Sequence, residues 1–135
     1  MGGIETLMSY GLTPSIKADV ATQKAIARAL NSVLPNAHRH FLSSLVPSFS
    51  CGDFFFAHAG VRPGVPLAKQ RNDDLLWIRG DFLHYEEDFG KIIVHGHTPV
   101  RELDIRSNRI NIDTGAYATG KLTLLTIQGS SMLAL

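Results

Sequence analysis

The sequence has 135 residues, enough for one compact domain with a moderate core. Its 44% hydrophobic and 19% charged residues are typical of an ordinary globular protein and exclude a disordered chain. The formal net charge of +1 provides no bulk attraction to nucleic acid or to a membrane surface, so we expect neither as a partner.

The single cysteine, Cys51, cannot form an internal disulfide, and its place before Gly52 indicates a turn residue. No apolar run approaches the roughly 20 residues that span a bilayer. The first residues also lack the pattern of a secretion signal, so we expect a cytoplasmic protein. The chain opens on Gly2 and Gly3 with no strand before them, as if it began in mid-fold.

The first third of the chain predicts three helices, over residues 4–10, 19–33 and 35–45. In the last of these, three apolar residues are expected to face inward: Phe41, Leu42 and Leu45. His38 and His40 lie about 200° apart around that helix, so they cannot bind one ion together, and we expect both on the surface.

Two apolar runs predict buried strands, residues 53–57 and 91–95. Residues 46–52 before them are expected to form a loop, and short helices are expected at 67–71 and 73–79. A loop rich in glycine and proline, residues 58–66, follows the first strand, which is a common place for chemistry. Beyond Pro99 we expect only strands, in two hairpins that pair 100–105 with 108–112 and 121–127 with 131–135.

Histidines follow both buried strands. His58 comes directly after the first, and His97 follows the second with Gly96 before it. Imidazole is a common ligand for transition metals. If the two strands are neighbours, His58 and His97 would therefore lie at one metal site. Arg79 is either a surface charge or an anion clamp whose guanidinium fits phosphate oxygens. His84 lies among polar residues and is expected on the surface.

Four segments, taken together and in this order, carry a family resemblance: residues 56–61, 74–79, 94–99 and 111–116. They resemble the second half of bacterial calcineurin-like metallophosphoesterases, and most of all the serine/threonine protein phosphatase branch. The opening residues 2–11 resemble the linker region of those proteins, so the resemblance covers most of the chain.

The resemblance implies an α/β (α+β) fold, a β-sandwich flanked by helices with four α/β/β/α layers in the complete family. It implies two divalent cations, which are manganese, iron or zinc, at the strand ends. It also implies that water attacks the phosphorus atom directly, without a phospho-enzyme intermediate. His58 and His97 match two ligands of the second metal, and Arg79 matches an arginine that binds the substrate phosphate. His95 matches no ligand, and its role is either to support the ligands from behind or to lie at the mouth of the site. Asp113 is either a support behind His97 or simply a turn former.

The first half of the family pattern is absent from this sequence: Gly-Asp-x-His-Gly, Gly-Asp-x-x-Asp-Arg-Gly and Gly-Asn-His-Glu. In the family these motifs supply the bridging aspartate, the other metal ligands, a second phosphate-binding arginine and the histidine that protonates the leaving group. Two neutral histidines cannot hold two dications without carboxylates. We therefore expect residues 1–135 to be one partial phosphoesterase domain, its C-terminal portion, that holds at most one metal and is inactive alone. The missing N-terminal half or self-association would complete it.

Three functions remain open from the sequence. The first is a metal-dependent phosphoester hydrolase that acts on phosphoproteins. The second is a symmetrical dinucleoside-tetraphosphate hydrolase of the same superfamily, and the motifs separate these two poorly. The third is a non-catalytic module that binds metal or depends on a partner. Metal analysis combined with a phosphatase assay would distinguish them.

Overall fold

The computed structural model describes residues 2–15, 17, 19–129 and 131–134. The chain forms two compact units, Met1–Leu45 and Val46–Leu135, called here the N-terminal and C-terminal units. The prediction of one domain stays a prediction, because two compact units can belong to one domain. No helix among the described residues is long and apolar enough to cross a membrane.

The N-terminal unit consists of three helices, α1 Gly3–Ser9, α2 Val20–Val33 and α3 Asn36–Ser44, close to the predicted ranges. Asp19 caps α2, because its carboxylate accepts a 2.8 Å hydrogen bond from the Thr22 backbone N–H. No residue of the three helices is buried. The inward orientation predicted for the apolar residues of the third helix is therefore wrong. Phe41 is 61% exposed, Leu42 is 53% exposed, and Leu45, directly after α3, is 56% exposed. Three short helices are too few to enclose a core of their own.

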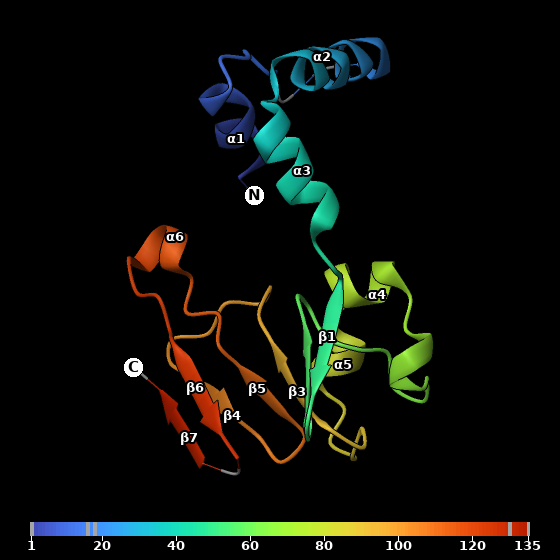
Figure 1. Ribbon diagram of the computed structural model, residues 1–135, viewed down its shortest axis with the longest axis vertical. Coiled ribbons are helices and arrows are strands. Elements are labelled where there is room, and N and C mark those ends of the chain that lie inside the picture. Colours follow the sequence, from blue (N-terminus) through green and yellow to red (C-terminus); the bar gives the residue numbers. More distant parts are fainter. Residues whose placement is uncertain (1, 16, 18, 130, 135) are drawn as a thin grey trace. The chain divides into compact units, whose positions relative to one another are not determined.

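The C-terminal unit is built on a five-stranded sheet of order β1-β2-β3-β5-β4 (Figure 1). Its strands are β1 Ser48–Cys51, β2 Phe54–Ala57, β3 Ile92–His95, β4 Asp104–Ile105 and β5 Arg109–Asn111. The three central strands β2, β3 and β5 run parallel, and the edge strands β1 and β4 are antiparallel to their neighbours. A separate antiparallel pair follows, β6 Leu125–Gln128 and β7 Ser131–Ala134.

The two faces of this sheet are covered differently, because successive side chains of a strand point to opposite faces. Phe55 and Ile93 belong to a core with residues of the short helices α4 Asn72–Trp77 and α5 Gly80–Leu83. Phe54 and Val94 belong to a second core that includes residues of β6. In Figure 1 the helices α4 and α5 and the β6–β7 pair accordingly lie on opposite sides of the sheet. This arrangement confirms the prediction that the strand after Asp53 is buried on both faces.

Several short elements differ from the prediction. Within the loop expected at 46–52, where the sequence left a short strand at Phe49 open, residues 48–51 form the strand β1. The turn of helix at 67–71 is the 3-10 helix η1 Leu67–Lys69. The expectation of strands alone beyond Pro99 is wrong, since α6 Ala116–Thr119 lies there between Gly115 and Gly120, both with left-handed backbone. Both hairpins form, and β4, β5 and β6 are shorter than predicted, whereas residue 135 of the predicted last strand lies outside the described residues.

Candidate metal and phosphate site

The carboxyl ends of the parallel strands gather the predicted site residues at one edge of the sheet, where ligands commonly bind in open α/β sheets. His58 follows β2 directly, His97 lies two residues after β3, and Asp113 lies two residues after β5. Backbone hydrogen bonds continue past the strand ends, from Gly96 N–H to the His58 carbonyl and from Ile112 N–H to the His95 carbonyl, each 2.9 Å. The loops that carry the site are thus extensions of the sheet.

His58 and His97 meet at this edge. The His58 Nε2 atom lies 3.1 Å from the His97 Nδ1 atom, and the ring centroids are 4.9 Å apart at an interplanar angle of 62°. Two nitrogens bound to one ion at about 2.1 Å are separated by about 3.0 Å at a right angle and about 3.4 Å at the tetrahedral angle. The observed separation lies between these limits, so the pair fits two ligands of a single divalent ion.

The backbone of His97 is held in an uncommon conformation. Among the described residues other than glycine, His97 alone has a positive φ, of 67°. Such left-handed residues are costly and concentrate at functional sites. Partial burial, followed by the positive charge of Arg79 and the proximity of His58, lowers the pKa of His97. The lowered pKa keeps the ring neutral at pH 7, which is the form that binds a metal.

The side chains of Trp77 and Arg79 flank His97. The Trp77 and His97 rings form a T-shaped pair at a centroid distance of 5.6 Å and an angle of 88°, and Trp77 is 69% exposed. Arg79 Nη1 donates a long 3.3 Å hydrogen bond to Thr98 Oγ1. Because this bond is long and the Arg79 side chain is exposed, its guanidinium remains available to an anion beside the histidine pair.

His95 is placed differently from the other histidines. It is 2% exposed, and its ring packs edge-on against Phe82 at 4.8 Å. Burial lowers the pKa of His95 to about 4, so its ring is neutral. Its Nδ1 atom lies 3.2 Å from the Gly96 carbonyl, and its Nε2 atom has no protein partner. His95 therefore lies behind the site and not at its mouth.

The Asp113 side chain contacts the turn that follows it, and both of its predicted roles stay predictions. Its Oδ1 atom accepts a 2.9 Å hydrogen bond from the Gly115 backbone N–H. The negative charge of Asp113 raises the pKa of His97, though less than burial and Arg79 lower it. Asn111, 2% exposed, secures the same region by donating from Nδ2 to the Thr98 carbonyl at 2.9 Å.

The pair does not extend to a complete metal site. Within the part of the chain that the structure describes, no group of three or more His, Cys, Asp and Glu side chains is arranged to hold a metal ion. Sequence reasoning selected both histidines from their positions at strand ends, and Arg79 from the chemistry of its guanidinium and the family resemblance. It gave no role to Trp77 or Asn111, although both stand inside the segments that carried the family resemblance.

Comparison with known proteins gives a relative and a shared fold. No protein-family model matches the sequence. The chain is 28% identical over 143 residues to a bis(5'-nucleosyl)-tetraphosphatase PrpE [asymmetrical] of Anoxybacillus flavithermus, a match over 91% of this chain and 55% of that protein. The chain thus spans about half the length of the curated relative that it matches.

A solved structure, described as "Crystal structure of a putative diadenosine tetraphosphatase", superposes with a TM-score of 0.65 at 18% sequence identity. The superposition covers 86% of this chain and 61% of that one. The two proteins share a fold. This confirms the predicted α/β class, a mixed sheet with helices.

Proposed function

We propose that this chain carries part of the active site of a metal-dependent phosphoester hydrolase. The observation that supports the proposal most directly is the 3.1 Å approach of His58 Nε2 to His97 Nδ1 at the carboxyl ends of adjacent parallel strands. The relative and the structural neighbour, both named as tetraphosphatases, agree with that chemistry. Residues that are not part of this sequence would supply the remaining metal ligands.

In this proposal His58 and His97 hold a divalent ion, and Arg79 binds phosphate oxygens beside it. Divalent ions in such a site polarise the phosphate and lower the pKa of the attacking water. The neutral His97 ring keeps its lone pair free for binding, because burial and Arg79 lower its pKa. The Arg79 guanidinium, always charged, would stabilise the negative charge that grows on the phosphate oxygens as the bond to the leaving group breaks.

The substrate class follows from two observations that point in different directions. The sequence motifs favour a phosphoprotein, as in the serine/threonine phosphatase branch. The names of the sequence relative and of the structural neighbour favour a dinucleoside tetraphosphate, which can be cleaved in two ways. Symmetrical hydrolysis with one water gives two nucleoside diphosphates, whereas asymmetrical hydrolysis gives a nucleoside monophosphate and a nucleoside triphosphate. Product analysis separates all three reactions.

Titration of the chain with Zn²⁺, followed by NMR of the histidine ring protons, tests the metal-binding part of the proposal. Zinc is the suitable probe because imidazole binds it more strongly than manganese. We expect the His58 and His97 signals to shift together, and either His58→Ala or His97→Ala to abolish the shift of the other. His84→Ala is the matched control, an exposed histidine outside the site. Equal titration in all variants would overturn the proposal.

Activity is tested in a chimera in which this chain replaces the matching 55% of the Anoxybacillus relative. We expect the chimera to hydrolyse one of the two substrate classes and the isolated chain to hydrolyse neither. His97→Ala should abolish turnover in the chimera, while His84→Ala should retain it. Turnover of a phosphate ester by the isolated chain with two bound metals would refute the claim that part of the site lies elsewhere.

A further inference from the structure

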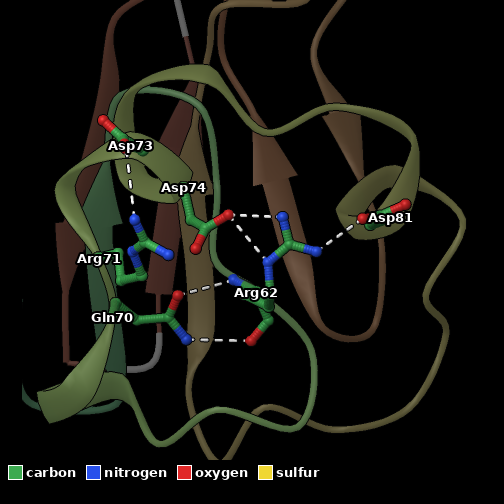
Figure 2. A network of polar contacts seen from close by, with 6 residues as sticks. All are labelled: Arg62, Gln70, Arg71, Asp73, Asp74 and Asp81. Atoms are coloured by element: carbon green, nitrogen blue, oxygen red, sulfur yellow. Dashed lines mark hydrogen bonds and ion pairs between the residues drawn. The ribbon is translucent and has the colours of Figure 1, made fainter.

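A bridge of three charged residues joins the loop after β2 to the helices α4 and α5 (Figure 2). Arg62 donates from Nε and Nη2 to one oxygen of Asp74, at 2.8 and 2.6 Å, and from Nη1 to Asp81 at 2.7 Å. One planar guanidinium thus binds two carboxylates from two helices. This Arg62 bridge was not predicted from the sequence, because its members lie 12 and 19 residues apart.

The backbone around Arg62 is fixed as firmly as its side chain. Gln70 accepts a hydrogen bond from the Arg62 N–H at 2.7 Å and donates one to the Arg62 carbonyl at 3.0 Å (Figure 2). Nearer to His58, the Ala59 N–H donates to the Leu75 carbonyl of α4 at 2.8 Å. The loop that begins at His58 is therefore tied to α4 by both main chain and side chain.

The two carboxylates of the bridge enclose the segment that carries Trp77 and Arg79. Asp74 lies in the first turn of α4, whose last residue is Trp77. Asp81 lies in the first turn of α5, which follows Arg79 directly. Arg79 itself has neither helical nor extended backbone, with φ −134° and ψ −100°. Because no regular hydrogen-bonding pattern fixes this residue, the angle between α4 and α5 depends on contacts from elsewhere in the chain.

We propose that Arg62 is a positioning residue, which holds the α4–α5 junction so that the Trp77 ring lies against the His97 ring and Arg79 lies against Thr98. The inference rests on the proposed function only for the chemical roles of Arg79 and the two histidines. The placement itself is a property of the chain without metal or substrate.

Exposure and geometry favour positioning over simple stabilisation. The side chains of Arg62 and Asp81 are 43% and 68% exposed, and exposed ion pairs contribute little to stability. The Asp74 side chain is only 14% exposed, so its pair with Arg62 also contributes to stability, and the test below therefore measures stability and positioning separately. A planar fork that binds two carboxylates nevertheless restricts orientation strongly. The neighbouring pair Arg71 and Asp73, with a single 3.7 Å approach and 78% and 83% exposure, has the same charges without that restriction and provides matched controls (Figure 2).

The test measures the nuclear Overhauser effect between the Trp77 indole and the His97 ring in the metal-free chain. Trp77 is the only tryptophan in the sequence, so its signals are unambiguous. We expect the cross-peak in the unmodified chain, its loss in Arg62→Gln, and a reduced intensity in Asp81→Asn and Arg62→Lys. Arg71→Gln and Asp73→Asn should keep it at full intensity. The melting temperature of each variant is recorded alongside.

A lowered melting temperature with an unchanged cross-peak in Arg62→Gln and Asp81→Asn would overturn the proposal, since the bridge would then only stabilise the fold. Absence of the cross-peak in the unmodified chain would overturn it as well. If Arg62→Gln does not fold, Asp81→Asn decides the question, because that carboxylate is largely exposed. A failed Zn²⁺ titration would refute the proposed function and leave this result standing.

Discussion

Two glycines allow the loops of the site to approach their neighbours closely. A Cβ atom on Gly60 would lie 2.3 Å from the Phe82 ring, and the φ of Gly60 is 148°, a region that other residues rarely adopt. A Cβ atom on Gly96 would lie 3.1 Å from Cβ of Asp113. The group that the backbone at Gly96 approaches so closely is therefore the Asp113 side chain.

Gly60→Ala should destabilise the C-terminal unit by about 3 kcal/mol, through a clash with a fully buried ring combined with backbone strain. Gly64→Ala is the matched control, since its φ is 74° but nothing lies within 4 Å of the added Cβ. The control should lose only about 1 to 2 kcal/mol, the strain alone. Urea unfolding measures both free energies, and equal losses would contradict the role given to Phe82.

Arg79→Ala should leave the free energy of unfolding within about 0.5 kcal/mol of the unmodified chain, because the side chain is exposed and makes one long hydrogen bond. In the active chimera the same change should weaken inhibition by inorganic phosphate by about 10- to 100-fold, the range for a lost charged hydrogen bond. Arg101→Ala, at another exposed arginine, should change neither value. An unchanged phosphate affinity in Arg79→Ala would remove Arg79 from the site.

At the scale of elements, β5 holds the chain that follows α5. Arg109 is 8% exposed and donates to the Leu83 carbonyl at 2.6 Å and the Tyr85 carbonyl at 3.0 Å. It also donates to Asn108 Oδ1 at 3.0 Å, and its guanidinium lies 5.9 Å from the Phe82 ring centroid. The strand β5 therefore supports the helix α5, which packs against His95, through the buried guanidinium of Arg109.

Arg109→Met should destabilise the chain by about 2 kcal/mol, because it leaves the part-buried Leu83 carbonyl without its side-chain donor and removes one of the two donors to the Tyr85 carbonyl. Arg106→Met provides the control: Arg106 is 58% exposed and paired with Asp104, so its loss should change stability by no more than about 0.5 kcal/mol. Both values come from urea unfolding at neutral pH. Similar small losses in the two variants would show that the carbonyls find water instead.

The elements with a clear hydrophobic pattern were predicted from the sequence, and those without one were missed. The long periodic helix α2 and the all-apolar strands β2 and β3 lie within one residue of their predicted bounds. The four-residue helices α5 and α6 are too short to show a period. The convergence of His58 and His97 followed from their places at strand ends, whereas the Arg62 bridge depends on tertiary folding that no local pattern encodes.

At the scale of the whole molecule, the two units differ in how much they bury. The C-terminal unit contains two clusters of buried apolar residues, one on each face of its sheet. In the N-terminal unit no residue of α1, α2 or α3 is buried, and large apolar side chains such as Met8 and Phe41 are each 61% exposed. Tertiary packing supplies most of the stability of helices in proteins. The three helices of the N-terminal unit therefore gain little stability from packing within their own unit.

Amide hydrogen exchange should therefore divide the chain at residue 45. In the isolated chain we expect the amides of α1, α2 and α3 to exchange at least about 100-fold faster than those of β2 and β3, because local opening of poorly packed segments requires little free energy. The measurement is exchange followed by mass spectrometry on peptides from both units, with α4 as an internal reference for a short helix that has a buried residue, Leu75. Equal protection across the boundary at residue 45 would mean that the exposed apolar side chains of the N-terminal unit are covered in solution, as self-association would do. A concentration series distinguishes that case, since protection by self-association falls on dilution.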